Sequence, residues 1–510
     1  MFESAELGHK IDDATYDKQT KKLRPELLQA QYDLLGCNVF PVIVLVNGVD
    51  GAGKGETVNL LNEWLDPRHI RSTAFGPPTE EERMRPPMWR FWRALPPKGK
   101  IGVLFGNWYT DPINGRVEHK LRASKLPAAI ERVRRFERLL TDDGALIVKL
   151  WFHLSKKGMK KRLEELEADK LTRWRVTKDD WRNFEHYDTF AKVSERVLRE
   201  TSTGDAPWVV IDGSNPNYRA ITAARTLLGA INGRLTEARA GSVEEKRAAR
   251  RKRTGAADAS TEAAPVFEAV DTSLILKELK FEERLSKEKY QTKIVKVQGE
   301  LAKLTRTSKM NEHSVIVVFE GMDAAGKGGA IRRVTGALDA RQYDVVPVAA
   351  PADEERAQPY LWRFWKNIPR VGRLSIFDRS WYGRVLVERV EGFATQGSWT
   401  RAYAEINDFE EQLTEAGAIV VKVWLAITKE EQLRRFKERE TTKFKQYKIT
   451  PDDWRNRKKW DDYIVAGGDM IDRTSTSFAP WHVIEANDKH LARVRVIEAI
   501  SERMKIAFEK

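Results

Sequence analysis

The sequence predicts an α/β protein with two tandem domains, each built on a parallel sheet that helices cover on both faces. A Gly-x4-Gly-Lys loop occurs twice, at residues 48–54 and 321–327, and each loop follows an apolar, β-branched run. Strand-like and helix-like segments alternate in each copy, which is typical of parallel sheets. The offset between the two loop lysines, 327 − 54 = 273, recurs along both copies without a net insertion: it pairs Trp92 with Trp365, Trp108 with Trp381, Trp151 with Trp424, Trp181 with Trp454 and Trp208 with Trp481.

A charged helical arm precedes each core, at residues 1–40 and at about 272–313. The second core then opens with the β-branched run 315–319, which predicts a buried strand. The glycine-rich loop follows this strand, and we expect a helix to begin at about Lys327. A loop of this kind between a strand and a helix places backbone N–H groups and a helix N-terminus around an anion.

Three further strands are expected in the second core. Residues 374–378, 419–425 and 482–485 are short apolar runs, and a long helical segment at about 400–415 separates the first two. A terminal helix follows the last strand. Because ligands bind at the carboxyl ends of parallel strands, the residues that follow these strands are candidate site residues.

The repeat divides the chain into an N-terminal domain at 1–232, a linker at 233–271 and a C-terminal domain at 272–510. The linker segment contains a basic run at 246–253, followed by residues rich in Ala, Ser and Thr. Such composition indicates a flexible, solvated connection. A nucleic-acid-binding or targeting role for the basic run is the less favoured interpretation.

Composition narrows the class of protein and its partners. A hydrophobic content of 41% and a charged content of 32% are typical of a soluble, globular chain of 510 residues. We find no apolar stretch of the roughly 20 residues that a membrane span needs, and no signal peptide, so we expect a cytoplasmic protein without membrane association. The single cysteine, Cys37, fits a reducing compartment. The formal net charge of +14 favours a polyanionic partner, and charge alone does not distinguish nucleic acid from other polyanions.

The loop of the second copy carries an unusual residue at its end. Most Gly-x4-Gly-Lys loops continue with Ser or Thr, whose hydroxyl binds Mg²⁺. Here Gly55 and Gly328 take that position, so carboxylates must hold the metal. Asp323 lies inside the loop, and we interpret it as a metal ligand, a base for the acceptor phosphate, or both. The backbone and the lysine of the loop are the candidate phosphate-binding groups: Gly321, Ala324, Ala325, Gly326, Lys327, Gly328 and Gly329.

The two copies differ at the end of the next strand. In the second copy the strand at 374–378 ends in Asp378 and Arg379, where a carboxylate can act on Mg²⁺ and a guanidinium can stabilise a transferring phosphoryl group. The first copy has Phe105 and Gly106 at these positions. We therefore predict catalysis in the second copy, with Asp323 and Asp378 as the metal ligands.

Other cations of the second copy are also lost from the first. Arg332 and Arg333 correspond to Asn59 and Leu60, Arg384 corresponds to Asp111, and Arg439 corresponds to Leu166. Further Lys and Arg residues follow in the segment 434–448. This basic segment could close over bound phosphates as a helical lid.

Two motifs of the second copy resemble those of a known family. The segments 320–329 (EGMDAAGKGG) and 378–384 (DRSWYGR) resemble the family-2 polyphosphate kinases, and the tandem arrangement resembles their two-domain subclass. The resemblance implies a P-loop kinase fold with a helical lid and Mg²⁺-dependent transfer of the terminal phosphoryl group of inorganic polyphosphate to AMP, giving ADP. It matches Asp323, Lys327, Asp378 and Arg379 to the essential positions of the family, and it adds Glu388 and Arg389 as residues that line the site.

Several alternatives stay open at this point. The donor could be ATP, or the acceptor could be ADP or GDP, on the same fold. The first copy could be a non-catalytic polyanion binder. The motifs make nucleic acid an unlikely partner. We also expect the two copies to pack as an intramolecular pseudo-dimer, and a homodimer is a further possibility.

Overall fold

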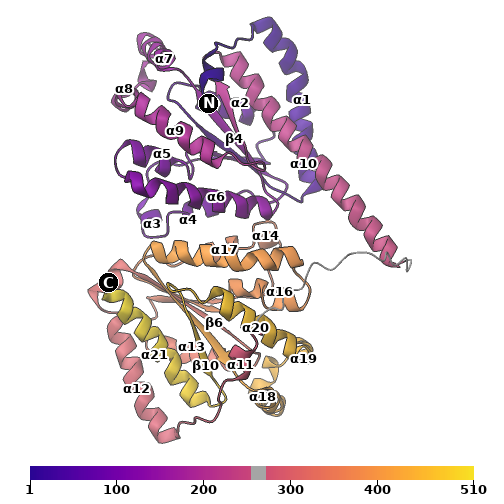
Figure 1. The fold of residues 1–510 in the computed structure, drawn as a ribbon, viewed down its shortest axis with the longest axis vertical. Helices are drawn as coiled ribbons and strands as arrows, with labels where there is room; N and C mark the ends of the chain where they lie inside the picture. The colour runs from indigo at the N-terminus through magenta and orange to yellow at the C-terminus, as the bar shows by residue number, and fades with distance from the viewer. Residues whose placement is uncertain (254–270, 510) are drawn as a thin grey trace. The chain divides into compact units, whose positions relative to one another are not determined.

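The computed structural model describes residues 1–253 and 271–509 and contains two compact units (Figure 1). The first unit comprises Met1–Pro78, Arg90–Thr261 and Ala352–Tyr360, and the second comprises Thr79–Trp89, Glu262–Pro351 and Leu361–Lys510. Each unit contains one five-stranded sheet in which all strands are parallel. The predicted fold class, two tandem α/β domains, is confirmed.

The sheet of the first unit has the strand order β2-β3-β1-β4-β5, with β1 in the centre. Helices α1, α2 and α10 pack against one another on one face of this sheet, and α5, α6 and α9 pack together on the other (Figure 1). Helices α7, η3 and α8 form a smaller group that adjoins α9. The strands are β1 (Val42–Gly48), β2 (Ile70–Ala74), β3 (Ile101–Phe105), β4 (Leu146–His153) and β5 (Trp208–Asp212). The helices are η1 (Glu3–Glu6), α1 (Asp13–Cys37), α2 (Lys54–Trp64), α4 (Trp89–Ala94), α5 (Thr110–Val117), η2 (Ala123–Lys125), α6 (Leu126–Asp142), α7 (Lys156–Ala168), η3 (Arg173–Arg175), α8 (Lys178–Glu185), α9 (Tyr187–Thr201), α10 (Pro216–Arg253) and α14 (Asp353–Arg356).

The second unit repeats this arrangement with the order β10-β9-β6-β8-β7. Helices α12, α13 and α21 cover one face, and α16, α17 and α20 lie on the other (Figure 1). The strands are β6 (Ser314–Gly321), β7 (Tyr343–Pro347), β8 (Leu374–Asp378), β9 (Ala418–Ala426) and β10 (Trp481–Glu485). The helices are α3 (Glu80–Arg83), α11 (Leu274–Lys277), α12 (Lys287–Leu304), η4 (Ser308–Glu312), α13 (Lys327–Thr335), α15 (Trp362–Trp365), η5 (Trp381–Arg384), α16 (Val387–Val390), α17 (Gln396–Glu415), α18 (Lys429–Thr441), η6 (Lys443–Lys448), α19 (Pro451–Lys458), α20 (Trp460–Thr474) and α21 (Lys489–Phe508).

The predicted elements of the second copy are present, and the structure adds one strand. Helix α13 begins at Lys327 as expected, and β8 has the predicted bounds. The added strand is β7, which lies at the edge of the sheet and leaves most of its residues exposed or half-buried. An edge strand of this kind carries no continuous apolar run, and so the apolar pattern of the sequence did not reveal it.

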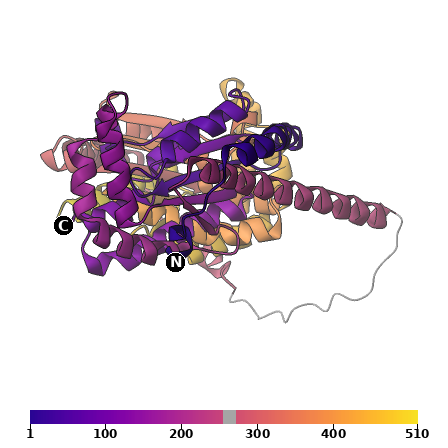
Figure 2. The same cartoon turned by 90° about the horizontal axis from the view of Figure 1, so that it is seen from above.

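The predicted flexible linker is wrong in its first part. Helix α10 continues to Arg253, twenty-one residues past the predicted domain end at 232 (253 − 232 = 21) (Figure 2). Leu227, Ile231 and Leu235 recur every four residues and are buried in the core of the first unit, so the apolar face of the helix continues past the predicted boundary. The rest of the predicted linker, residues 254–270, lies outside the described residues.

The paired tryptophans are mainly core residues, as expected. Trp92, Trp108, Trp151 and Trp208 are buried in the first unit, and their counterparts Trp365, Trp381, Trp424 and Trp481 are buried in the second. The acids of the predicted helix caps are also structural. Asp180 and Asp453 accept hydrogen bonds from the backbone N–H of Thr177 and Thr450, at 2.7 and 2.8 Å. No helix in the described part of the chain is long and apolar enough to span a bilayer.

A buried ion pair fixes the segment that follows Asp378 and Arg379. Lys422 of β9 contacts Glu410 of α17 at 2.7 Å, and both side chains are fully buried. Glu410 also accepts hydrogen bonds from Trp381 Nε1 at 3.0 Å and from the Tyr382 hydroxyl at 2.7 Å. Burial lowers the pKa of Lys422, and the Glu410 carboxylate opposes this shift. The first unit has the same network around Lys149 and Glu137, so the network belongs to the shared framework.

We expect Lys422→Met to reduce the stability of the second unit by about 3–5 kcal/mol, because it leaves the Glu410 carboxylate buried without a counter-charge. Denaturant unfolding followed by tryptophan fluorescence measures this loss. Lys149→Met should destabilise the first unit by a similar amount, whereas the exposed Lys296→Met should change stability by less than about 0.5 kcal/mol. A loss at Lys422 no larger than that at Lys296 would contradict the structural role of the network.

Candidate active site

The glycine-rich loop of the second unit connects the central strand β6 to helix α13. Gly321 has a φ of 135°, and a Cβ atom there would lie 2.4 Å from the carbonyl oxygen of Leu425. Gly326 caps α13 in the left-handed region, which glycine adopts at low cost. Lys327 begins the helix and donates from Nζ to the carbonyl oxygen of Gly321 at 2.6 Å. This hydrogen bond holds the Lys327 ammonium group next to the first residue of the loop.

Lys327 lies among charged groups of both signs. Burial lowers the pKa of Lys327, the Arg379 guanidinium lowers it further, and the carboxylates of Asp323, Asp378 and Glu320 oppose the change. The predicted residues Asp323, Lys327, Asp378 and Arg379 are thus brought together at the carboxyl ends of β6 and β8. A cationic centre next to carboxylates and the backbone N–H groups of the loop is suited to bind phosphate.

Asp323 is held in place by two neighbours. Its Oδ1 accepts from Arg379 Nη2 at 3.1 Å, and its Oδ2 accepts from Asn456 Nδ2 at 2.9 Å. Its backbone carbonyl accepts from Gln432 Nε2 at 3.0 Å. Gln432 lies on α18 and Asn456 on α19, just before and after the predicted lid segment 434–448, so both of these helices contact the loop directly. The carboxylate is consequently oriented before any ligand binds.

Asp378 and Arg379 end strand β8 next to the loop. The register of the sheet places Asp378 beside Phe319 of β6. Arg379 has a φ of 66°, and its N–H donates to the carbonyl oxygen of Phe319 at 3.1 Å. Among the described residues, no side-chain hydrogen bond engages the half-buried carboxylate of Asp378. This carboxylate is therefore available to a ligand or a cation.

A third carboxylate, which the sequence did not reveal, lies beside the loop. Glu320, the last residue before the loop, is buried and accepts a hydrogen bond from Ser380 Oγ at 2.9 Å. Burial raises the pKa of Glu320, and the Lys327 ammonium opposes this shift. At the same offset the first unit has Asn47 and Asn107, whose side chains hydrogen-bond to each other at 3.3 Å. Comparison of the two copies at the offset of 273 residues could have shown that Glu320 and Ser380 replace Asn47 and Asn107.

Arg435 belongs to the predicted basic segment 434–448, but its contact with the loop was not predicted, and Asn456 of α19 was missed altogether. Arg435 of α18 is buried and donates from Nη1 to the carbonyl oxygens of Ala324 and Ala325, both at 2.9 Å, so it supports the loop from behind. Asn456 has a counterpart in Asn183, which donates to Asp50 of the first unit at 3.0 Å. The asparagine therefore recurs at the offset of 273 residues, but a single Asn does not by itself indicate a functional site.

The other predicted residues lie at varying positions around the loop. Gly328 and Gly329 are in the first turn of α13, whereas Arg332 and Arg333 are in its last turn. Arg333 points to α12, where its Nε donates to the Tyr290 hydroxyl at 3.4 Å, so the structure does not bring it to the loop. Arg439 lies in the last turn of α18.

Arg384, Glu388 and Arg389 follow strand β8 in η5 and α16. Arg384 and Glu388 form an ion pair at 2.8 Å. Arg389 contacts Asp469 of α20 at 2.7 Å and lies over the ring of Trp399 at 4.4 Å. Arg389 therefore links α16, α17 and α20 beside the site. Its contacts are with these helices, and not with the glycine-rich loop.

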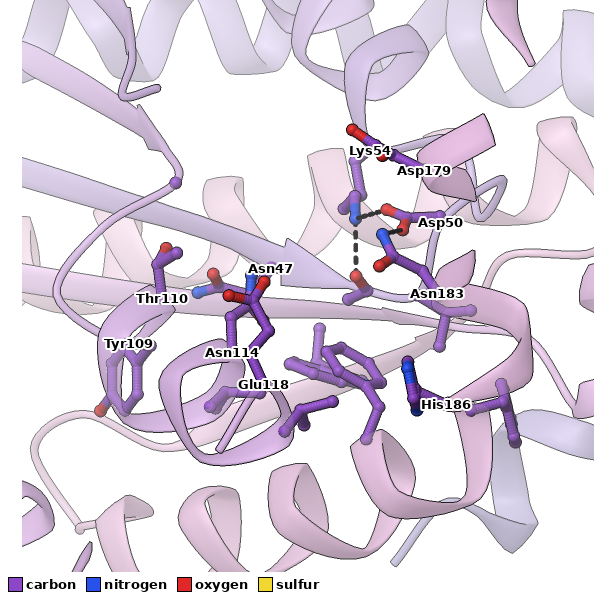
Figure 3. A pocket seen from close by; sticks show the side chains of 18 of the residues that line it. Asn47, Asp50, Lys54, Tyr109, Thr110, Asn114, Glu118, Asp179, Asn183 and His186 are labelled. Atoms are coloured by element: carbon purple, nitrogen blue, oxygen red, sulfur yellow. Dashed lines mark hydrogen bonds and ion pairs between the residues drawn. The ribbon is translucent and has the colours of Figure 1, made fainter. Parts of the chain in front are cut away.

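The first unit keeps the loop and changes its charges. Lys54 contacts Asp50 at 3.1 Å, a pair that forms where the counterpart of Arg379 is Gly106 (Figure 3). The Lys54 ammonium in turn lowers the pKa of Asp50. A cavity of about 680 Å³ adjoins this loop, and Phe105 lines it in place of Asp378. The first unit thus retains a pocket and lacks the second carboxylate.

Comparison with known proteins agrees with this geometry. The family model described as Polyphosphate kinase 2 (PPK2) matches residues 10–239 and again 284–510, so that it covers both units. The chain belongs to the polyphosphate kinase 2 family. Within this family, it is 53% identical over 510 residues to the polyphosphate:AMP phosphotransferase of Pseudomonas aeruginosa, with 100% of each chain covered.

A second relative and a solved structure support the assignment to the polyphosphate kinase 2 family. The polyphosphate:AMP phosphotransferase of Acinetobacter johnsonii is 39% identical over 496 residues, covering 95% of this chain and 96% of that protein. A crystal structure of a polyphosphate kinase 2 from Pseudomonas aeruginosa PA01 superposes with a TM-score of 0.88 at 52% identity, and the match covers 100% of both chains. The tandem arrangement is therefore shared with these relatives over their whole length.

Proposed function

We propose that this protein transfers the terminal phosphoryl group of inorganic polyphosphate to AMP, giving ADP, and that the reaction takes place in the second unit. The observation that carries the proposal is the cluster of Asp323, Lys327, Asp378 and Arg379 at the carboxyl ends of β6 and β8. Full-length relatives are named for this reaction. The net charge of +14 suits a donor that is a chain of negative charges.

In this reaction the main role of the protein is to position the phosphate groups and to neutralise their charge. In phosphoryl transfer, charge develops on the oxygens of the transferring group, and fixed cations stabilise it. Lys327 and Arg379 supply such cations beside the loop. Asp323, held by Arg379 and Asn456, orients the acceptor phosphate or accepts its proton. Binding both substrates in this geometry replaces a bimolecular encounter by a step within one complex.

The residues at the site fit a magnesium ion. Mg²⁺ is usually bound by one or two carboxylates together with substrate phosphates, and the described residues contain no cluster of three or more metal-ligating side chains. Asp378, whose carboxylate has no side-chain partner there, and Asp323 would hold the ion. Bound Mg²⁺ would offset the charge of the phosphates at the site.

We also infer a cytoplasmic location for the reaction. The single cysteine, Cys37, is free, which agrees with a reaction in the cytoplasm. The intramolecular pseudo-dimer and the homodimer stay predictions of the duplicated sequence, and sedimentation of the intact chain tests the latter. We do not propose nucleic acid as a substrate on the basis of the basic run at 246–253.

The function is tested by measuring ADP formation from AMP with polyphosphate and, separately, with ATP as the donor. We expect ADP to form with polyphosphate and Mg²⁺, and to fall to background when EDTA removes the metal. Activity with ATP alone would make the protein an ordinary nucleotide kinase. Product from ADP or GDP, at rates exceeding those with AMP, would favour the triphosphate-forming alternative.

A further inference from the structure

The cavity of the first unit lies at the carboxyl ends of its central strands. It has a volume of about 680 Å³, and it is lined by the end of β1, by Phe105 of β3, by Trp151 of β4 and by residues of α5, α8 and α9 (Figure 3). All of its lining residues belong to the first unit. A pocket of this size and place in a parallel sheet is typical of a small-molecule site. The reaction proposed for the second unit gives this cavity no ligand.

Uncharged residues line this cavity where the second unit carries charged ones. At the offset of 273 residues, three charged residues next to the second loop are each replaced by an uncharged residue that lines the cavity. The replaced pairs are Glu320 and Asn47, Asp378 and Phe105, and Arg379 and Gly106. The cavity has therefore lost the groups that suit the second site to phosphate and a metal ion.

The cations that remain in the lining are each paired with a carboxylate that also lines the cavity. The three ion pairs are Lys54 with Asp50 at 3.1 Å, Lys120 with Glu118 at 2.5 Å and Arg182 with Asp179 at 3.1 Å. The Lys, Arg, Asp and Glu side chains of the lining thus sum to no net charge (3 − 3 = 0). A ligand with several negative charges gains little from such a lining.

Aromatic rings form much of the apolar part of the lining. Phe75, Phe105 and Phe190 are half-buried and border the cavity. The ring of Phe190 stacks on that of Trp151, with the centroids 5.8 Å apart and the planes at 23°. Aromatic rings of this kind bind the flat face of another ring. The lining therefore favours a ligand that contains a planar ring.

Asparagine side chains supply the cavity with hydrogen-bonding groups (Figure 3). Asn114 of α5 is exposed where it lines the cavity. Asn47 donates to Asn107 at 3.3 Å, and Asn183 donates to Asp50 at 3.0 Å, so these two amides are held in place. Because an amide group both donates and accepts, it can pair with the polar edge of a nucleic-acid base.

We propose that the cavity of the first unit is a binding site for a nucleoside. A nucleoside combines a planar base, polar edges and no charge, and these are the properties that the rings, the asparagines and the neutral lining match. The inference goes beyond the proposed function and does not depend on it, because it concerns the unit without the second carboxylate. It also makes the first copy a small-molecule site in place of the polyanion site that the sequence left open.

Adenosine binding to the intact chain tests the proposal, and isothermal titration calorimetry counts the sites. Asn114→Trp should fill the cavity, so this variant should bind one adenosine fewer per chain than the wild type does. Asp111→Trp is the matched control, since Asp111 is exposed in the first turn of the same helix and lies outside the cavity lining. It should keep the wild-type number of sites. Circular dichroism checks that both variants are folded.

A second variant tests the aromatic lining without filling the cavity. Phe105→Leu keeps an apolar side chain of similar size and removes the ring, so it should weaken adenosine binding at this site by about 5- to 100-fold. A wild-type chain that does not bind adenosine would overturn the proposal. The same number of sites in the wild type and in folded Asn114→Trp would also overturn it, as would an unchanged affinity in Phe105→Leu.

AMP and tripolyphosphate distinguish a nucleoside site from a phosphate site. At the site that Asn114→Trp removes, AMP should bind no more tightly than adenosine, and tripolyphosphate should not displace adenosine. Binding of AMP there more than about ten-fold tighter, which is about 1.4 kcal/mol, would show a phosphate-directed site and refute the inference. Binding is read without turnover, so an adenosine site in a chain that forms no ADP would leave this inference standing while the proposed function fails.

Discussion

Lys327→Ala should lower kcat/KM for polyphosphate-dependent ADP formation by about 10²–10³-fold, which corresponds to roughly 3–4 kcal/mol of transition-state stabilisation. In the proposed reaction, the Lys327 ammonium group offsets charge on the transferring phosphoryl group. It also ties the loop together through its hydrogen bond to the carbonyl oxygen of Gly321. Steady-state kinetics with saturating AMP and varied polyphosphate measure the loss.

The duplicated chain supplies the control for this substitution. Lys54→Ala removes the equivalent lysine of the first unit, which is paired with Asp50, and should change the rate by no more than a few-fold. Both variants should keep the circular dichroism spectrum of the wild type. Comparable losses in the two variants would contradict the assignment of catalysis to one unit.

Asp378→Phe should reduce activity by about 10³-fold or more, because it removes the one clustered carboxylate that no protein side chain engages among the described residues. The substitution should leave the fold intact, since the first unit carries Phe105 at the same place in its sheet. Turnover at several Mg²⁺ concentrations, together with a thermal unfolding curve, separates loss of chemistry from loss of structure.

Asp378→Asn is the companion variant, because it keeps the size and hydrogen-bonding capacity of the side chain and removes its charge. It should also be strongly impaired, and added Mg²⁺ should not restore the wild-type rate. If either variant retained turnover close to that of the wild type, Asp378 would not be needed for catalysis, and Asp323 or Glu320 would have to supply the carboxylate.

Most of the framework could be predicted from the sequence, because it depends on local patterns. Apolar runs located four of the five strands in the second copy, and the glycine-rich loop fixed the start of α13 at Lys327. The edge strand β7 and the extension of α10 were missed. Strand β7 has no apolar run. Helix α10 adds Leu235 to the core of the first unit, although the repeat had suggested that the domain ends at residue 232.

The residues of the candidate site could be predicted where a charged residue of one copy is replaced in the other. Contacts that depend on the packing of distant helices could not be predicted in this way. The exchange of Asp378 and Arg379 for Phe105 and Gly106 led to the prediction that the second copy is the catalytic one. The contacts of Asp323 with Asn456 and Gln432 could not be foreseen, since they join residues 133 and 109 positions apart in the chain. A basic sequence pattern likewise could not show that Arg333 faces Tyr290 while Arg435 supports the loop.

The exchanged polar pairs next to the two loops also bear on how such a chain folds. Two similar sequences in tandem invite strands of one copy to pair with strands of the other, a characteristic failure of repeat proteins. Glu320 is matched to Ser380, whereas Asn47 is matched to Asn107. An exchange of the first or third strand between copies would bury each of these groups beside the wrong partner. Where such an exchange leaves a buried polar group without a partner, it costs about 1–3 kcal/mol, so we expect these exchanged pairs to favour the pairing of each strand within its own sheet.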